Sequence, residues 1–401
     1  MERQGRLRFR QVSGRPTGPN LRFAEFFAGI GLVRMGLERA GWSLEFANDI
    51  DPQKLEMYEG HFGDASGHFA DIDIHAIDGA TIRDIELATA SFPCTDLSLA
   101  GARLGFEGKH SSAFWGFAKV LREMGDRRPP LVMLENVVGF LTSHGGEDFR
   151  AALSALNVLG YAVDAFVLDA KWFVPQSRPR LFVIGSMIPD SAPATSTGSS
   201  RLRPPLLQRF IAEHPEIKWQ LRDLPEPPAA SPLSLRDIIE DLPNDAPEWW
   251  NEARTEYLYK QFSKRHREVA DALIKKHEWS YSTVFRRVRV QPDGSKRSMG
   301  ELRTDGIAGC LRTPKGGSGR QILVKAGYDQ FRVRLVTPRE CARLMGAEDF
   351  EIVVPDNQAY FGFGDAVCVP AITWIACNYL SPLVANPRTA RGTSKSRMGV
   401  A

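Results

Sequence analysis

The feature that most constrains the fold is an alternation of short apolar runs with amphipathic stretches between residues 22 and 185. The first run, Arg22–Ala28, leads into the turn Gly29-Ile30-Gly31 and then into the helical stretch Leu32–Ala40. A strand that passes through a glycine turn into a helix is the repeating unit of α/β proteins. Strands that alternate with helices predict a mostly parallel sheet covered on both faces. The sequence therefore predicts a doubly wound α/β fold.

More units of this kind follow. Ser43–Asn48 is expected to be a strand, and Asp51 and Pro52 suit the N-cap and the first position of the next helix. The other strands and helices expected in this part of the chain are Ile85–Phe92, Ser112–Met124, Leu131–Glu135, Glu147–Leu159, Tyr161–Leu168 and Arg180–Ile184. A strand-like run at Thr283–Val290 and helical patterns at Pro338–Met345 and Ala371–Leu380 come later.

Charge is unevenly distributed along the chain. The net charge is +3, but residues 252–325 carry 17 Lys+Arg against 8 Asp+Glu, a local net of +9. The rest of the chain then holds 34 against 40, or −6. A basic segment on an acidic body is expected of a nucleic-acid binder, and a solvated surface rich in arginine is the alternative.

Five cysteines without a CxxC pair argue against a disulfide framework and a structural zinc site, so no metal is expected. No apolar run reads as a membrane span, and the N-terminus lacks the apolar core of a signal peptide. These features predict a cytoplasmic protein that does not bind a membrane.

The glycine turn is suited to a nucleoside ligand. Gly29 and Gly31 would present backbone amides at a helix N-terminus. Asp49 lies 20 residues after Gly29 at a strand end, where a carboxylate can accept hydrogen bonds from ribose hydroxyls. Asp71, after the next expected strand, could receive an adenine amino group. Helix caps or surface acids are the alternative.

Three segments are expected to end at the ligand-binding edge of the sheet. They are Ser91-Phe92-Pro93-Cys94, Leu134-Glu135-Asn136-Val137 and Pro175-Gln176-Ser177-Arg178-Pro179-Arg180. Taken singly, they could be a packing cysteine, a strand-end acid and a surface arginine pair.

Taken in order, the motifs FAGIGL, FPC, ENV, QSRPR, VTPREC and FGDAVCVP resemble the cytosine-C5 DNA methyltransferases of bacterial restriction-modification systems. The resemblance covers residues 22–185 and 302–380. It implies the Rossmann-like S-adenosylmethionine-dependent methyltransferase fold with a smaller target-recognition domain. The implied reaction transfers a methyl group to carbon 5 of cytosine in a specific duplex DNA sequence, EC 2.1.1.37.

The resemblance also implies catalytic roles. Cys94 would add to carbon 6 of a flipped-out cytosine, Glu135 would hold a proton at ring nitrogen 3, and Arg180 would contact the carbonyl oxygen. Gln176 and Arg178 would support this site. A thiolate with a depressed pKa and a carboxyl group with a raised pKa would suit these roles. Asn136 would brace the Glu135 loop, and residues 95–110 would form a lid.

The cofactor implied is S-adenosylmethionine. Its implied contacts are Phe27, Ala28, Gly29, Ile30, Gly31, Asp49, Ile50, Asp71, Ile72, Phe92, Pro93, Asp365 and Ala366. Several residues depart from the family pattern: Asp365 replaces a common Asn, Thr95 a frequent Gln and Leu32 a frequent Gly, while Ala113 is smaller than usual. These departures concern cofactor affinity more than chemistry.

The resemblance implies that the variable segment reads DNA. The implied DNA contacts are Thr95, Ser98, Gln176, Arg286, Arg287, Arg289, Arg303, Thr304 and Arg312. The expected division is a flexible arm (1–20), a catalytic and cofactor-binding part (21–186), a connecting and target-recognition part (187–325), a returning catalytic part (326–385) and a tail (386–401). Eleven of the 26 prolines fall in residues 189–247, which marks the first boundary.

The expected partners are double-stranded DNA and a cognate restriction endonuclease, and the protein is expected to be a monomer. A tRNA-cytosine methyltransferase is the first rival, but its Cys-Phe-Thr signature is absent. A silent DNA-binding subunit is the second rival, and it would not need Cys94, Glu135 and Arg180 together.

Overall fold

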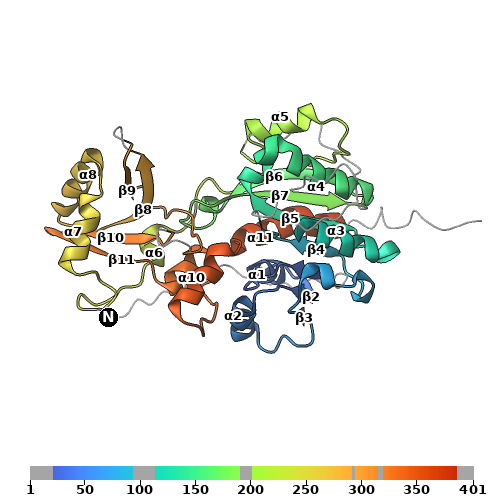
Figure 1. Cartoon of the computed structure of the whole chain (residues 1–401), viewed down its shortest axis with the longest axis horizontal. Helices are drawn as coiled ribbons and strands as arrows, with labels where there is room; N and C mark the ends of the chain where they lie inside the picture. Colours follow the sequence, from blue (N-terminus) through green and yellow to red (C-terminus); the bar gives the residue numbers. More distant parts are fainter. Residues whose placement is uncertain (1–20, 94–112, 190–200, 291–293, 315–318, 386–401) are drawn as a thin grey trace, which may run out of the picture.

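The computed structural model describes residues 21–93, 113–189, 201–290, 294–314 and 319–385. Within them, one sheet of seven strands and one of four form a large and a small lobe (Figure 1). The expected arm, tail and lid at residues 95–110 lie outside the described residues.

The large sheet is mostly parallel, as predicted. Its strands, in spatial order, are β3 (Phe69–Ala70), β2 (Ser43–Asn48), β1 (Arg22–Phe26), β4 (Leu87–Ala90), β5 (Leu131–Val137), β7 (Pro179–Ser186) and β6 (Ala162–Asp169). Only β7 runs against its neighbours. The connection from β6 to β7 is short and contains only the 3-10 turn Ala170–Trp172, whereas a parallel neighbour needs a longer crossover. As a result, β7 begins at the edge where β5 ends.

Helices cover both faces of this sheet, because the strands alternate apolar side chains between them. The helices of this part are α1 (Leu32–Arg39), α2 (Pro52–Phe62), α3 (Ala113–Glu123) and α4 (Glu147–Val158). On β1, Phe23 shares a core with α1 and the C-terminal helices, while Ala24 and Phe26 share a core with α3 and α4. As predicted, Asp51 caps α2, its Oδ1 accepting the Gln53 N–H at 3.0 Å.

The proline-rich segment returns to the large lobe before the chain leaves it. Leu207, Phe210 and Ile211 on α5 (Pro205–Glu213) belong to the same core as β5 and α4. Arg203 and Asp164 form an ion pair at 2.7 Å with both side chains fully buried. The short helix α6 (Leu235–Ile238) then leads to the small lobe.

The small lobe is an antiparallel sheet backed by two helices. Its order is β11 (Gln330–Leu335), β10 (Ile322–Gly327), β8 (Ser280–Val290) and β9 (Lys296–Arg303), with α7 (Glu252–Lys260) and α8 (Lys264–Ile274) against one face. This sheet extends past residue 326, where the returning catalytic part was expected to begin, because β11 pairs with β10 along its length. The domain division stays a prediction, and this pairing favours a boundary after β11.

The chain then returns to the large lobe through α9 (Pro338–Leu344), α10 (Asp356–Asp365), α11 (Val369–Ile375), a π-helical turn (Ala376–Leu380) and α12 (Ser381–Ala385). The Thr373 hydroxyl on α11 donates to the Gly36 carbonyl of α1 at 3.0 Å. Within the described residues, the helical stretch Asp356–Ala385 is long and apolar enough to span a membrane, although the sequence reading found no such run. More than half of its apolar window is buried in the large lobe, which is the pattern of a core helix.

Candidate active site and DNA-binding surface

The turn after β1 has a backbone that leaves room for a ligand. Phe27, Gly29 and Gly31 all have positive φ, at 57°, 57° and 79°. A Cβ on Gly31 would lie 2.4 Å from the Phe62 ring, so only glycine fits there. No side chain caps the amides of α1 at Gly31. The turn therefore presents backbone donors at the carboxyl edge of the sheet.

Residues after β2 and β3 complete a cradle beside this turn. The buried Asp49 accepts the Gly29 N–H through Oδ2 at 2.7 Å. Asn48 donates to the Ala70 and Ile72 carbonyls, both at 2.8 Å. Ile50 and Ile72 are 62% and 43% exposed, high values for isoleucine beside a buried carboxylate. Two uncovered apolar side chains next to acids suit an adenosine group, and Asp71 is exposed alongside them.

The strand that leads to the predicted nucleophile is firmly held. Phe92 is buried and packs on Phe114 and Phe140, with ring centroids 5.5 and 5.6 Å away. Asn136 donates from Nδ2 to the Phe92 carbonyl at 3.2 Å. Asn136 therefore braces the strand before Cys94, in addition to its own turn. Pro93 is exposed, and Cys94, Thr95 and Ser98 lie outside the described residues.

Glu135 and Arg180 meet at the same edge. Arg180 Nε lies 3.0 Å from Glu135 Oε1, with 15% and 10% of the two side chains exposed. Val137 pairs with Arg180 across β5 and β7, so the reversed direction of β7 brings Arg180 to the end of β5. Burial raises the pKa of Glu135, and it outweighs Arg180, Arg178 and a hydrogen bond from Ser91, which act to lower it. The carboxyl group can therefore hold a proton more readily than an ordinary glutamate.

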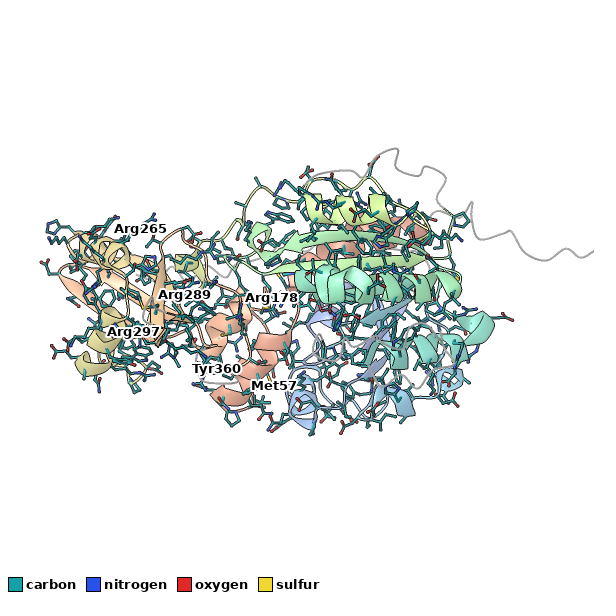
Figure 2. The ribbon with its side chains drawn as sticks, turned by 45° about the horizontal axis from the view of Figure 1, so that its top comes forward. Met57, Arg178, Arg265, Arg289, Arg297 and Tyr360 are labelled. Carbon is teal, nitrogen blue, oxygen red and sulfur yellow. The ribbon has the colours of Figure 1, made fainter. Side chains whose placement is uncertain are left out.

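Arg178 has a structural position rather than a place at the edge. Its guanidinium is buried and donates to the carbonyls of Leu311, Gly364 and Ala366 at 2.6–2.9 Å. Figure 2 shows Arg178 where the large sheet meets the C-terminal segment. Arg178 joins the sheet to the segment between β9 and β10 and to the returning chain, a position that suits the predicted supporting role.

A direct DNA contact by Gln176 does not fit the structure. Its side chain is completely buried. It donates to the Leu344 carbonyl at 2.7 Å and accepts the Leu311 N–H at 3.0 Å. Both polar ends of the amide are used inside the protein, and we therefore withdraw Gln176 from the predicted DNA contacts.

Comparison with known proteins shows the family of the chain. The C-5 cytosine-specific DNA methylase family model matches residues 21–380. The chain belongs to this family. It is a DNA (cytosine-5-)-methyltransferase, EC 2.1.1.37, of the kind found in restriction-modification systems.

Relatives and solved structures match over most of their length. The chain is 29% identical to the Type II methyltransferase M.HhaI of Haemophilus parahaemolyticus, covering 92% of this chain and 96% of that protein. It is 28% identical to M.HpaII of Haemophilus parainfluenzae, covering 89% of each. The crystal structure of S. pombe Dnmt2 methyltransferase has a TM-score of 0.60 at 19% identity, covering 91% of this chain and 99% of that one. At that identity the likeness shows the fold alone.

The small lobe of the methyltransferase carries the predicted DNA-contacting arginines on β8 and β9. Arg287 and Arg289 are about half exposed and both pair with Glu301 on β9. Phe285 lies between Arg287 and Arg312, whose guanidinium carbons are 5.4 and 5.0 Å from the ring centroid.

The other predicted contacts on this lobe differ in exposure. Arg303 pairs with Asp305 at 2.7 Å, and Thr304 is exposed. Arg286 is half-buried. Arg289 and Arg297, labelled in Figure 2, face each other across the β8–β9 pairing. We call this set the basic edge of the small lobe: Arg287, Arg289, Arg297, Thr304 and Arg312 are exposed, and Arg286 and Arg303 are partly buried.

Cys310, which was not among the predicted site residues, lies close to Arg178 and Arg180. Its Sγ is 3.3 Å from Arg178 Nη1. Burial acts to raise the pKa of Cys310, but Arg178, Arg180 and Arg312 outweigh it, so the net shift is downward. Nothing in the sequence near Cys310 signals this contact, because Arg178 is 132 residues away.

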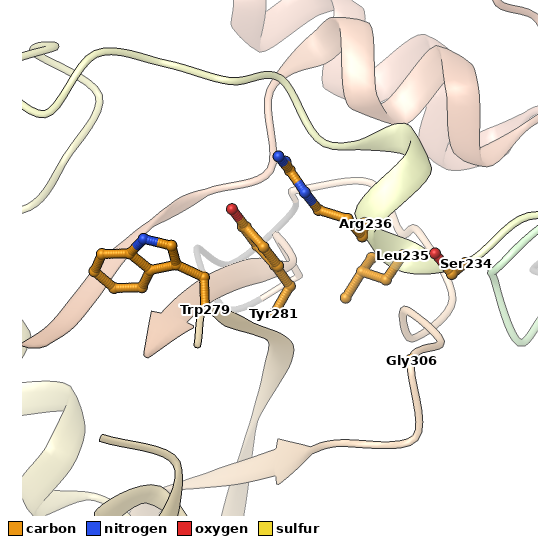
Figure 3. Close-up of a pocket in the computed structure, with 6 residues that line it drawn as sticks. All are labelled: Ser234, Leu235, Arg236, Trp279, Tyr281 and Gly306. Atoms are coloured by element: carbon orange, nitrogen blue, oxygen red, sulfur yellow. The ribbon is translucent and has the colours of Figure 1, made fainter. Parts of the chain in front are cut away.

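A separate pocket lies between α6 and the small sheet. Its lining residues are Ser234, Leu235, Arg236, Trp279, Tyr281 and Gly306 (Figure 3). The Arg236 guanidinium stacks over Tyr281 at 4.7 Å. None of these residues was predicted to belong to the site, and the pocket lies on the connection between the lobes. Among the described residues, no group of three His, Cys, Asp or Glu side chains is placed to hold a metal ion.

Proposed function

We propose that this methyltransferase modifies carbon 5 of cytosine within a specific duplex DNA sequence, through a covalent adduct between Cys94 and a flipped-out base. The observation that supports this most directly is the buried Glu135–Arg180 pair, because it places a proton-holding carboxyl group and a cation at one point. That point lies next to the segment after β4, where Ser91 is hydrogen-bonded to Glu135 and Asn136 braces Phe92, two residues before Cys94.

In this proposal S-adenosylmethionine supplies the methyl group. The cradle fits its adenosine part, since Ile50 and Ile72 offer apolar walls and Asp49 and Asp71 offer acceptors for ribose and adenine. Backbone groups of Phe27, Ala28, Gly29, Ile30 and Gly31 line the methionine side. Phe92, Pro93, Asp365 and Ala366 would close the site from the sheet edge and from α10.

The residues of the chain divide the work on cytosine. The Cys94 thiolate would form a bond to carbon 6 and push electron density toward carbon 5. Glu135 would hold a proton at nitrogen 3, and Arg180 would contact the carbonyl oxygen as negative charge develops. After carbon 5 gains its methyl group, its proton would leave to water and the carbon–sulfur bond would break.

Duplex DNA would be gripped by the basic edge of the small lobe. Arg286, Arg287, Arg289, Arg303, Thr304 and Arg312 are the proposed contacts, together with Thr95 and Ser98, which lie outside the described residues. The target base must leave the stack because carbon 5 is inaccessible to a thiolate inside the duplex. We propose that the protein is a cytoplasmic monomer. Its partner in the system would be a restriction endonuclease that recognises the same DNA sequence.

The test measures transfer of labelled methyl groups from S-adenosylmethionine to duplex DNA, to single strands and to tRNA. Duplex DNA should be the substrate, with label on carbon 5 of cytosine. Cys94→Ser should abolish turnover and still bind DNA. Turnover by that variant, or transfer to tRNA alone, would contradict the proposal. Bisulfite sequencing of DNA from cells that express the protein would then give the target sequence.

A further inference from the structure

A lysine connects the two ends of the cofactor cradle. Lys54 lies in the first turn of α2, and its Nζ is 3.2 Å from Asp365 Oδ2 at the end of α10. Its Cδ lies 3.9 Å from the position that a Cβ on Gly29 would occupy. The side chain therefore runs alongside the glycine turn and ends at the returning segment, 311 residues later in the sequence.

The charge around Lys54 is strongly acidic. Asp49, Asp365 and Asp51 all act on its ammonium group, and together they raise the pKa of Lys54 although burial acts to lower it. The Asp49 carboxylate accepts the N–H groups of Gly29 and Asp51 at 2.7 and 3.0 Å, and its remaining acceptor sites are the ones proposed for the ribose. Asp365, with 50% of its side chain exposed, is the acid beside Lys54 that is open to another ligand group.

The Lys54–Asp365 pair is not what joins the two helices. Gln358 on α10 donates to the Gln53 carbonyl at 2.9 Å and to Glu56 at 2.7 Å. Gly362 packs so closely on Met57 that a Cβ there would lie 2.6 Å from the sulfur. Figure 2 labels Met57 in this contact region. Because α2 and α10 are already fixed by these contacts, the charge pair is free to serve a ligand.

The methionine end of the proposed cofactor carries an ammonium and a carboxylate group on one carbon atom. A lysine and an aspartate 3.2 Å apart, beside the glycine turn, offer one opposite charge to each of these groups. We propose that Lys54 and Asp365 recognise this zwitterionic end, with Lys54 binding the carboxylate and Asp365 the ammonium. The inference rests on S-adenosylmethionine being the cofactor. It assigns Lys54, which the sequence reading did not single out, as a residue that sets cofactor selectivity.

The pairing also gives a physical reason for Asp365. Without Lys54, the carboxylate of Asp365 would be an uncompensated negative charge next to Asp49 and Asp51. Lys54 supplies the missing positive charge, so an aspartate can stand where the family commonly has an asparagine.

The experiment compares two ligands by calorimetry, without turnover. S-Adenosylhomocysteine keeps the amino-acid end, and 5′-methylthioadenosine lacks it. Lys54→Met keeps most of the aliphatic stem. It should weaken the binding of S-adenosylhomocysteine about tenfold and leave the binding of 5′-methylthioadenosine unchanged. Asp365→Asn should weaken the binding of S-adenosylhomocysteine only about threefold, because the amide oxygen still accepts a hydrogen bond from the ammonium group.

The control is Glu348→Gln, which removes an acid of similar exposure from the Arg343–Glu348 pair, outside the cradle. This variant should bind both ligands with the affinity of the wild type. An equal loss of both ligands in Lys54→Met, or no loss of either, overturns the inference. If Lys54→Met does not fold, Asp365→Asn provides the test: a loss of affinity for S-adenosylhomocysteine but not for 5′-methylthioadenosine supports the inference, and equal losses overturn it. Failure of the wild-type protein to bind either ligand would instead contradict the proposed cofactor.

Discussion

The two lobes use charged side chains in opposite ways. At the edge of the large sheet, Glu135 and Arg180 are nearly buried, and Arg203 and Asp164 are completely so. On the small sheet, Arg287 and Arg289 are more than half exposed and share one acid, Glu301. Buried pairs are little affected by salt, whereas exposed pairs contribute about 0–1 kcal/mol and exchange partners easily. The first arrangement suits a reaction with fixed geometry, and the second suits arginines that trade a carboxylate for a phosphate.

The largest effect should come from the buried pair. Glu135→Gln should lower kcat about 100-fold or more, because an amide cannot hold and return a proton at the base. DNA binding, measured by fluorescence anisotropy, should change little. Glu86→Gln is the matched control, since Glu86 is paired with Arg22 at the opposite edge of the same sheet. A kcat close to that of the wild type in Glu135→Gln would remove Glu135 from the chemistry.

Arg178 tests whether the buried cation holds the large lobe together. Arg178→Ala would leave the carbonyls of Leu311, Gly364 and Ala366 without this donor. We expect a loss of about 3 kcal/mol or more in the free energy of unfolding, seen as a fall in Tm of several degrees. Arg150→Ala, which removes an exposed arginine paired with Glu147, should lower Tm by about 1 °C or less. Equal falls in the two variants would show that burial of Arg178 contributes nothing.

Glu25 gives the large lobe a pH dependence. Burial raises the pKa of Glu25 to about 8 from 4.5 and outweighs the opposing effect of Arg34. The folded state therefore binds this proton more tightly, so its contribution to stability is full below pH 4.5 and is lost as the pH rises through 8. Glu25→Gln should raise Tm relative to the wild type by about 3 °C or more at pH 9 and change it less at pH 5. A Tm difference that does not vary with pH would contradict the shift.

The smallest effect should come from the exposed pair. Glu301→Gln would remove a negative charge shared by Arg287 and Arg289, so affinity for non-target DNA should rise about twofold to threefold, with a steeper dependence on salt. Glu256→Gln makes the same charge change on α7, where Glu256 pairs with Lys260. A similar rise in both variants would mean that total charge matters and the arrangement on β9 does not.

The sequence predicted the large lobe well because its strands and helices carry strong local patterns. Ser43–Asn48 and the helix capped by Asp51 appear as expected, and the seven-stranded sheet has the predicted class. The direction of β7 could not be predicted, since apolar periodicity is the same in both directions. That direction is what brings Arg180 to Glu135.

Long-range contacts account for the residues that were misplaced or missed. Gln176 is a polar residue in a motif that resembled a DNA contact, yet its partners are Leu311 and Leu344, 135 and 168 residues away. Lys54 and Cys310 gain their surroundings in the same way, from Asp365 and Arg178. A local pattern carries no information about such partners, so the site edge was predictable and its supporting contacts were not.

The contact between α1 and α11 has a consequence for synthesis of the protein. Gly36 and Thr373 are 337 residues apart, so α11 cannot cover α1 until the chain between them has been synthesised. Until then Val33 and Leu37 lack the apolar partners that α11 provides, among them Ile372. A prematurely terminated chain would expose this surface and lose the segment that Arg178 holds. We therefore expect chains that end before α11 to be more sensitive to proteolysis than the full chain, because one face of α1 stays uncovered.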